Sequence, residues 1–478
     1  MSKKTSASQS FDFVVIGGGS AGYTAAAEAV KLGLRTALIE GGADLGGLCI
    51  LKGCMPSKTL IASANRFHAV TTAGELGVQV TSRPRFNARF VIARKRRLVE
   101  AFAKSRRDEI GRGGFKIIRG QARFLDRFTV SIVFPEGGSE LQLTGKTFLI
   151  ATGSYIPKPE FLGMMKVGYL TSDDILEDAS PPRSVMVLGD GPVGLEAAHY
   201  YATIGCRVTV VSKHSRILNS ADADVSRALA QSLVKSGVKI IYHATIESAR
   251  KVGAAKEVKL QIKGRTRSVR AHEIIFAIGR QPRVSGIGLE DAGVKLNDDG
   301  HVGANEQQRT SQAHIFAAGD VCGPYEILHL AVQQGRIAAR NAARHLAKLR
   351  GSIESMDYRM SLSAVFTEPQ VAVLGLTERK ARREKIVVRV ASYAFAEEGR
   401  AQVEGETAGF AKLICEPKSG KLLGAAIVGP AAAELIHEMV AVLYLGGTVE
   451  TIAALPHYHP TLSEIWTFPA EILAKTRR

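Results

Sequence analysis

Hydrophobic positions follow the same order in two long stretches of the chain. In residues 11–40 an apolar run, FDFVVI, ends at a glycine-rich turn, an alanine-rich helical segment follows, and a second apolar run, TALIE, closes the stretch. Residues 183–212 repeat this order. Strand, turn, helix and strand in this order are typical of a dinucleotide-binding unit. The pattern predicts an α/β protein with two Rossmann-like domains.

Each of the two turns holds three glycines with the spacing G-x-G-x-x-G. In such turns the first glycine permits the tight bend, the second lets a pyrophosphate approach the backbone, and the third lets helix pack on strand. The N-terminus of the helix then offers free N–H groups to the phosphates. Both triplets are complete, which argues against a vestigial copy: they are Gly17, Gly19 and Gly22, and Gly189, Gly191 and Gly194.

The two copies differ at the end of the second strand. The first copy ends in Glu40, whose carboxylate suits a ribose hydroxyl. The equivalent position of the second copy is Ser212, which Lys213, His214 and Arg216 follow. A neutral hydroxyl flanked by basic residues accepts a 2′-phosphate, which a carboxylate would repel. The second site is therefore predicted to favour NADPH.

A pair of cysteines, Cys49 and Cys54, lies in the segment GGLCILKGCMPSK, residues 46–58. Such a pair is either a structural or metal-binding feature or a disulfide that opens and closes during a reaction. A zinc site that adds His457 and His459 matches no common ligand spacing. Cys54 begins a predicted helix, and a helix N-terminus stabilises the thiolate that redox chemistry needs.

Composition narrows the setting of the protein. The chain has 478 residues, enough for about three domains, and only five cysteines, which does not indicate a secreted disulfide framework. It lacks an apolar stretch approaching the ~20 residues of a membrane span. These features predict a cytoplasmic protein with no membrane insertion. The net charge is +18, but the densest basic run, residues 93–109, has the spacing of one amphipathic helix. We therefore expect no nucleic-acid partner.

These motifs together resemble the class I pyridine nucleotide–disulfide oxidoreductases, the family of dihydrolipoyl dehydrogenase, glutathione reductase and mercuric reductase. The resemblance covers nearly the whole chain and implies FAD and NAD(P)H as cofactors and a homodimer. It also rests on five further segments: FLIATGSYIP (148–157), IFAIGRQPR (275–283), IFAAGDV (315–321), FTEPQVAVLGLTE (366–378) and HYHPTLSE (457–464).

The resemblance also assigns roles to single residues. Cys54 would be the thiol beside the flavin and Cys49 the thiol that exchanges with substrate. Lys58 would pair with Glu196 near the flavin. His459, oriented by Glu464 and supplied by the partner subunit, would be the general acid–base, whereas His457 and His329 receive no catalytic role. The expected FAD-binding residues are Gly17, Gly19, Gly22, Glu40, Gly47, Lys58, Ala151, Thr152, Gly153, Gly319 and Asp320. Those expected for NAD(P) are Gly189, Gly191, Gly194, Ser212, Lys213, Arg216, Gly279 and Arg280.

Several details bear on the substrate. The C-terminal tail has no cysteine pair of the mercuric reductase kind, and Pro192 stands where glutathione reductases usually carry a tyrosine. The pattern is closest to dihydrolipoyl dehydrogenase and predicts a dithiol or disulfide substrate and a role in cell redox homeostasis. An NADPH-dependent glutathione reductase-like or mercuric reductase-like enzyme is the first alternative. A non-catalytic flavin redox sensor or interaction protein is the second.

The motifs also predict how the chain divides. The FAD domain is expected in two parts, residues 1–157 and 285–355, with the NAD(P) domain, residues 158–284, inserted between them. A linker, residues 351–360, would lead into a C-terminal α+β dimerisation domain, residues 356–478.

Overall fold

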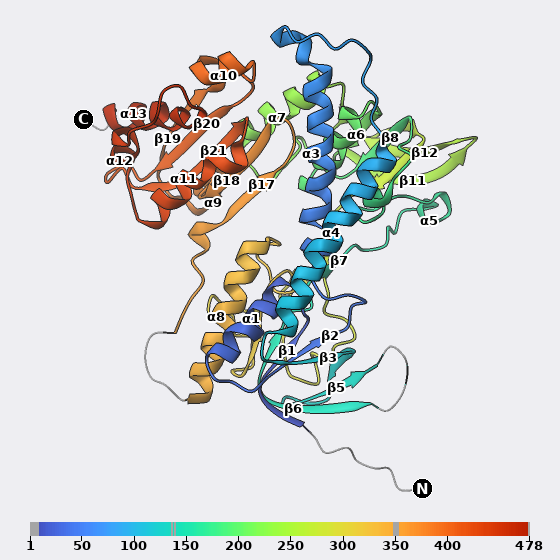
Figure 1. Ribbon diagram of the computed structural model, residues 1–478, viewed down its shortest axis with the longest axis vertical. Helices are drawn as coiled ribbons and strands as arrows, with labels where there is room; N and C mark the ends of the chain where they lie inside the picture. The colour runs from blue at the N-terminus through green and yellow to red at the C-terminus, as the bar shows by residue number, and fades with distance from the viewer. Residues whose placement is uncertain (1–8, 135–136, 138–139, 348–352, 477–478) are drawn as a thin grey trace. The chain divides into compact units, whose positions relative to one another are not determined.

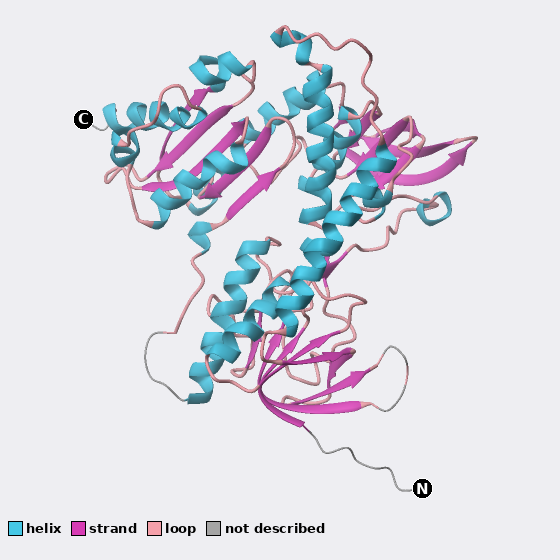
Figure 2. Cartoon of the chain, in the orientation of Figure 1, coloured by secondary structure: helices cyan, strands magenta, loops and turns pink. Residues whose placement is uncertain are grey.

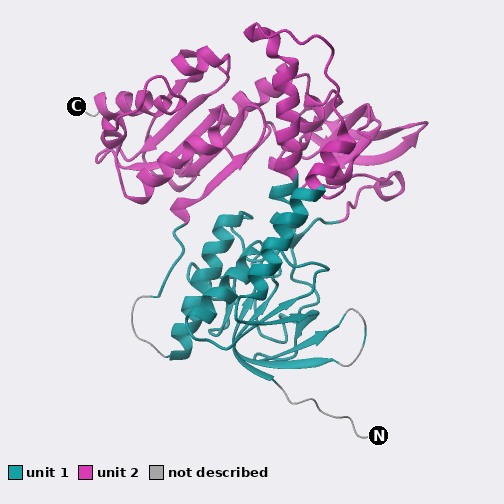
Figure 3. Ribbon diagram, viewed as in Figure 1, with its two compact units in different colours: residues 1–56, 96–157, 280–357 teal, residues 57–95, 158–279, 358–478 magenta. Residues whose placement is uncertain are grey.

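The protein is described in a computed structural model, which describes residues 9–134, 137, 140–347 and 353–476. The start of the predicted linker, residues 351–352, lies outside the described residues. The chain forms two compact units, coloured separately in Figure 3. Unit 1 comprises residues 1–56, 96–157 and 280–357, and unit 2 comprises residues 57–95, 158–279 and 358–478.

The described residues of unit 1 form a seven-stranded mixed sheet. Its order is β3-β2-β1-β6-β5-β4, with β16 paired to β6, and the strands around β1 run parallel. Phe13, Val14 and Val15 in β1 are fully buried, as expected for a parallel strand covered on both faces. The strands are β1 (Gln9–Ile16), β2 (Thr36–Glu40), β3 (Lys116–Arg119), β4 (Gln121–Phe124), β5 (Thr129–Val133), β6 (Leu141–Ile150) and β16 (Ile315–Ala317).

Helices α1 and α8 pack side by side against this sheet (Figures 1 and 2). A Cβ added to Gly335 of α8 would lie 2.3 Å from the carbonyl oxygen of Ala21 in α1, so only glycine permits this close approach. Two long helices, α3 and α4, run from one unit into the other along the sequence. The helices are α1 (Ser20–Lys31), α2 (Gly47–Leu51), α3 (Cys54–Thr71), α4 (Ala88–Gly111) and α8 (Leu328–Ala347); a short ribbon pairs β7 (Ser154–Tyr155) with β15 (Gln281–Pro282).

The first part of unit 2 repeats the dinucleotide fold on a smaller scale. A four-stranded parallel sheet has the order β10-β9-β8-β14, and a three-stranded antiparallel sheet, β11-β12-β13, accompanies it. The strands are β8 (Ser184–Leu188), β9 (Arg207–Val211), β10 (Lys239–Ile241), β11 (Ala244–Val252), β12 (Ala255–Ile262), β13 (Arg265–Ala271) and β14 (Glu273–Phe276). The helices are α5 (Met164–Val167), α6 (Pro192–Thr203) and α7 (Ala223–Lys235).

The C-terminal part of unit 2 is an α+β layer. Its five-stranded antiparallel sheet has the order β17-β18-β21-β20-β19, and α11 packs on β18 and β21. Trp466 and Phe395 are among its largest fully buried side chains. The strands are β17 (Leu362–Val365), β18 (Gln370–Gly375), β19 (Arg389–Ala394), β20 (Phe410–Cys415) and β21 (Leu422–Gly429); the helices are α9 (Glu378–Glu384), α10 (Gly399–Glu404), α11 (Ala432–Tyr444), α12 (Val449–Ala454) and α13 (Thr467–Lys475).

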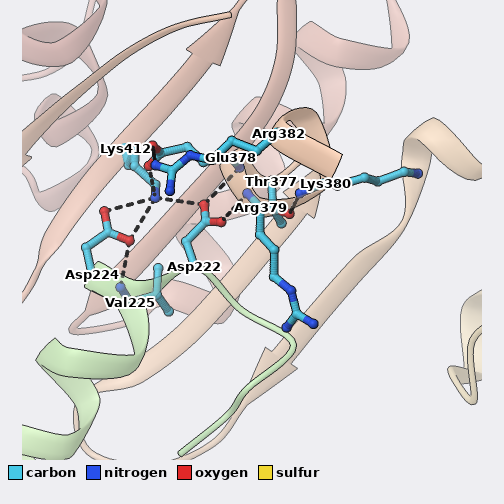
Figure 4. Close-up of polar contacts among 9 residues, drawn as sticks. All are labelled: Asp222, Asp224, Val225, Thr377, Glu378, Arg379, Lys380, Arg382 and Lys412. Atoms are coloured by element: carbon cyan, nitrogen blue, oxygen red, sulfur yellow. Dashed lines mark hydrogen bonds and ion pairs between the residues drawn. The ribbon is translucent and has the colours of Figure 1, made fainter. Parts of the chain in front are cut away.

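A buried lysine, Lys412 of β20, holds the two parts of unit 2 together (Figure 4). Its Nζ donates to Asp222 at 2.8 Å, to both carboxylate oxygens of Asp224 at 2.9 Å, and to Glu378 at 2.9 Å. Asp222 also accepts the backbone N–H groups of Glu378 and Arg379, at the start of α9. Burial alone would lower the pKa of Lys412, but the three carboxylates raise it above its usual range.

The prediction of an α/β protein with two Rossmann-like folds and a C-terminal α+β domain is confirmed. The two compact units do not separate the predicted NAD(P) domain from the predicted dimerisation domain, since both lie in unit 2. The predicted boundaries between these domains therefore stay a prediction. The basic run at residues 93–109 lies within α4, as predicted. Among the described residues we find no helix that is long and apolar enough to cross a membrane.

Candidate active site

The first glycine turn follows β1 and is closed on two sides. A Cβ on Gly17 would lie 2.3 Å from the carbonyl oxygen of Ala151, and one on Gly22 would lie 1.8 Å from that of Gly17. A Cβ on Gly19, by contrast, would meet no atom within 4 Å. The first and third glycines therefore serve packing, and the second faces open space at the N-terminus of α1. This arrangement fits the pyrophosphate of FAD.

Glu40 stands beside this turn, at the end of β2. The N–H of Gly18 donates to its Oε2 at 2.8 Å, and the N–H of Gly42 donates to its Oε1 at 2.6 Å. Two backbone donors thus fix the carboxylate, and its remaining lone pairs suit the hydroxyls of a ribose. The space is tight, because a Cβ on Gly18 would lie 2.8 Å from Oε2.

A polar network in unit 1 joins Asp320, which is expected at FAD, to Ser154 and Arg280. Ser154 donates its hydroxyl to Asp320 Oδ2 at 2.6 Å, and Arg280 Nε donates to that hydroxyl at 2.7 Å. The guanidinium of Arg280 also donates to the carbonyl oxygen of Ser154 at 3.1 Å. The expectation that Arg280 contacts the nicotinamide nucleotide stays a prediction. The neighbouring residues expected at FAD are on the loops that follow β6 and β16: Ala151, Thr152, Gly153 and Gly319.

The cysteine motif packs onto the first glycine turn. Gly47 begins α2, and a Cβ there would lie 2.8 Å from the Cα of Gly19. Cys49 lies in the same short helix and is half-buried, and Cys54 is the exposed first residue of α3. The short helix with Cys49 therefore starts at the pyrophosphate turn, and Gly53, just before Cys54, packs back on it, because a Cβ there would lie 3.0 Å from the carbonyl oxygen of Leu48.

Lys58, four residues after Cys54 in α3, is joined to Glu196 of α6. Its Nζ lies 2.7 Å from Glu196 Oε2 and 2.9 Å from Oε1. The N–H of Phe366 donates to Oε1 at 3.1 Å, and the Lys58 ammonium lies 4.7 Å from the centre of the Phe366 ring. The sequence did not single out Phe366, because only the fold brings it to this pair.

The second glycine turn, after β8, is built like the first. A Cβ on Gly189 would lie 2.1 Å from the carbonyl oxygen of Ala277, and one on Gly194 would lie 2.6 Å from that of Gly189. A Cβ on Gly191 would again meet no atom within 4 Å. The turn therefore fits the pyrophosphate of a pyridine nucleotide, and Gly279 follows closely after Ala277 in the chain.

Ser212, which follows β9, bonds to a carboxylate of the glycine turn that the sequence analysis did not single out. The hydroxyl of Ser212, which is fully buried, donates to Asp190 Oδ2, and His214 Nδ1 lies 3.0 Å from the same oxygen. Asp190 stands between the first two glycines of the turn, where the first copy has Gly18. Lys213 is exposed and Arg216 is half-buried.

The C-terminal histidines differ in their surroundings. His459 is 78% exposed, and its Nδ1 lies 3.0 Å from Glu464 Oε1. Burial alone would raise the pKa of Glu464, but the N–H of Thr461 and the His459 ring lower it below its usual value. His457 is 9% exposed and uses both ring nitrogens, on Glu438 and Thr467, which indicates a structural role.

The described residues contain one group of acidic, histidine or cysteine side chains close enough to hold a metal ion, which is Asp222, Asp224 and Glu378. The ammonium of Lys412 bonds to all three, so a cation already occupies the middle of this group.

Two dinucleotide folds, with a cysteine pair packed against the first glycine turn, define a flavin-dependent disulfide oxidoreductase. The comparisons with known proteins agree. A family model described as pyridine nucleotide-disulphide oxidoreductase matches residues 11–335, and one described as the dimerisation domain of that family matches residues 361–469. The chain belongs to this family. It uses FAD and NAD(P)H, and the second match supports a homodimer.

Individual relatives are similar over nearly the whole of this chain. The chain is 32% identical over 470 residues to a dihydrolipoyl dehydrogenase of Geobacillus stearothermophilus, covering 97% of this chain and 96% of that protein. It is 30% identical over 455 residues to a mercuric reductase of Bacillus cereus, covering 95% of this chain and 70% of that one.

Solved structures show the same architecture. LpdA of Mycobacterium tuberculosis has a TM-score of 0.86 at 27% identity, covering 97% of this chain and 99% of that chain. The HOCl-induced flavoprotein disulfide reductase RclA of Escherichia coli, in a Cu(II) complex, has a TM-score of 0.84 with the same identity and coverage.

Proposed function

We propose that Cys49 and Cys54 are the redox pair of a dihydrolipoyl dehydrogenase-like enzyme whose substrate is a small or lipoyl-type dithiol or disulfide. The observation that supports this best is the contact of Gly47 with Gly19, which starts the cysteine motif at the pyrophosphate turn. Bound FAD supplies the hydride chemistry with the nicotinamide and exchanges two electrons with the disulfide.

The protein groups divide the sulfur chemistry between them. In the direction of dithiol oxidation, a substrate thiolate attacks Cys49, the Cys49–Cys54 bond breaks, and Cys54 leaves as a thiolate. The second substrate thiol then displaces Cys49, and the substrate leaves as a disulfide. His459 accepts the proton of the first thiol and releases it to solvent, and it then accepts the proton of the second thiol and returns it to Cys49 as that sulfur leaves. Glu464 orients the ring and stabilises its charged form.

The remaining groups support this exchange. The N-terminus of α3 stabilises the Cys54 thiolate, and Lys58 keeps a positive charge one helical turn away. Glu196 fixes the position of the Lys58 ammonium. The prediction that His459 and Glu464 act on the cysteines of the partner subunit belongs to the same proposal, as does a reducing, cytoplasmic setting with no nucleic-acid partner.

A side-by-side turnover measurement tests the proposed substrate class. Lipoamide, glutathione disulfide and Hg(II) would each be supplied with NADH or NADPH, using the wild type and Cys49→Ser. We expect lipoamide to be turned over best and Cys49→Ser to abolish that activity. Faster turnover of glutathione disulfide or Hg(II) would contradict the substrate. A Cys49→Ser variant with wild-type activity would contradict the redox pair.

A further inference from the structure

Each nucleotide site has a carboxylate between its glycine turn and the end of its second strand, but the acid comes from a different position in each copy. In the first site Glu40, at the end of β2, bonds to the N–H of Gly18 in the glycine turn. In the second site the turn itself carries the acid, Asp190, and the end of the strand carries the hydroxyl, Ser212. Asp190 and Ser212 are thus the counterparts of Gly18 and Glu40, with the acid and the small residue exchanged.

Space explains why each site has only one acid. In the first site a Cβ on Gly18 would lie 2.8 Å from Glu40 Oε2, so a side chain there would displace the Glu40 carboxylate from its place. In the second site the short Ser212 leaves this space to the Asp190 side chain. That side chain is only 13% exposed. Its position is therefore set by the fold and not by solvent.

Hydrogen bonds hold the second acid in place. Asp190 Oδ2 accepts the hydroxyl of Ser212 and lies 3.0 Å from His214 Nδ1. The carbonyl oxygen of Asp190 accepts the N–H of Leu218 at 2.8 Å, and Ser212 Oγ accepts the N–H of His214 at 3.0 Å. Both backbone and side-chain hydrogen bonds therefore connect the second glycine turn to the loop after β9.

We propose that Asp190 supplies the ribose-binding carboxylate of the nicotinamide-nucleotide site, so that the site favours the free 2′-hydroxyl of NAD(H) over the 2′-phosphate of NADP(H). A fixed carboxylate accepts hydrogen bonds from a ribose and repels a phosphate in the same region. This inference rests on the proposed function in one respect, that a pyridine nucleotide binds at this site. It does not depend on which disulfide is the substrate.

The basic residues that follow β9 oppose the preference for NAD(H) only weakly. His214 is already engaged by Asp190. Lys213 is exposed, where solvent and salt screen its attraction for a phosphate. Arg216 is half-buried and lines a pocket of about 500 Å³ together with α7 residues. The sequence around Ser212 predicted a preference for NADPH without considering Asp190. With Asp190 included, we propose the opposite preference, for NADH.

Binding of two nucleotide fragments to the FAD-loaded protein tests the proposal without any disulfide. ADP-ribose and 2′-phospho-ADP-ribose would be titrated calorimetrically into the wild type, Asp190→Asn and a surface control, Asp298→Asn. We expect the wild type and the control to prefer ADP-ribose, and Asp190→Asn to shift the ratio toward the 2′-phosphate by about tenfold or more, as for a lost charge-assisted contact. The ratio of kcat/KM for NADH and NADPH should shift alike.

A reciprocal variant separates this role from a structural one. Asp190→Gly should lose the preference for ADP-ribose, and adding Ser212→Glu should restore it, because the pair then repeats Gly18 and Glu40. A wild type that prefers the 2′-phospho compound, an Asp190→Asn ratio within about twofold of the control, or binding of neither fragment would overturn the proposal. A failure of the lipoamide test alone leaves these binding results unaffected, so the two failures can be told apart.

Discussion

Lys58 Nζ lies 2.7 Å from Glu196 Oε2 and so joins the helix that begins with Cys54 to the helix that begins at the second glycine turn. The Lys58 side chain is 32% exposed, whereas that of Glu196 is 10% exposed. Removing Lys58 should therefore lower the free energy of unfolding more than removing the charge of Glu196. A buried carboxylate without a counter-charge is more costly than a partly solvated ammonium.

Replacing Lys58 with methionine should lower the free energy of unfolding by about 1–3 kcal/mol, because Glu196 is left buried with one backbone donor. Glu196→Gln should cost less, since the amide oxygen still accepts the N–H of Phe366. Urea unfolding of both variants, with Lys31→Met as an exposed control, measures this difference. A Lys58→Met variant as stable as the control would contradict the role given to the pair.

Replacing His459 with alanine should slow the reaction with dithiol by about 10²-fold or more, the usual scale for a lost general acid–base. Reduction of the bound flavin by NAD(P)H should change little in stopped-flow experiments. His457→Ala is the matched control, because that ring bonds to Glu438 and Thr467 and should affect stability more than proton transfer. Equal slowing of both half-reactions by His459→Ala would rule out this role.

Co-expression tests whether the acid–base acts on the partner's cysteines. Subunits carrying Cys49→Ser and subunits carrying His459→Ala would be inactive alone. If each site combines the two subunits, random mixed dimers should regain about a quarter of wild-type activity, because half of them contain one intact site out of two. No recovery in isolated mixed dimers would show that each site is built within one subunit.

Glu368 should make stability fall as the pH rises. Burial, and then the neighbouring Glu406, raise the pKa of Glu368 to about 7. Between its ordinary pKa near 4.5 and this value, the folded state keeps a proton that the unfolded state has lost. The folded protein therefore loses about 2–3 kcal/mol from this group as the pH rises through that window.

Glu368→Gln should remove that dependence, because its amide oxygen still accepts a hydrogen bond from Asn65. The variant should be more stable than the wild type at pH 8 and similar to it at pH 4.5. Urea unfolding at both pH values, with the exposed Glu75→Gln as control, measures the change. Parallel curves for Glu368→Gln and the wild type would contradict the prediction.

Lys412→Met should destabilise the protein by about 3–5 kcal/mol, because it leaves three carboxylates together without their cation. Lys412→Arg should recover part of the loss, since a guanidinium keeps the charge but not the shape of the site. Lys418→Met, an exposed lysine near the same strand, serves as the control in thermal and urea unfolding. A loss no larger than that of the control would show that the cluster does not hold the two parts of unit 2.

Local motifs were predictable from the sequence, and contacts between distant residues were not. The glycine turns are defined by neighbouring residues, and His459 and Glu464 are only five residues apart, so spacing alone brought them together. Asp190 looked like an ordinary turn residue until the fold placed it against Ser212. Lys412 is the one charged residue among the apolar residues of β20, and its acidic partners lie as many as 190 residues away in the sequence.

Thiol labelling tests the central claim, that Cys49 and Cys54 form the redox pair, most directly. The oxidised, FAD-loaded protein would be treated anaerobically with iodoacetamide before and after one equivalent of NAD(P)H per subunit, then digested and analysed by mass spectrometry. We expect Cys49 and Cys54 to be unlabelled before reduction and labelled after it, with Cys49 labelled faster. Cys322, which is buried and whose pKa burial raises to about 12, should react slowly in both samples. Full labelling of Cys49 and Cys54 in the oxidised protein, or none after reduction, would contradict the account.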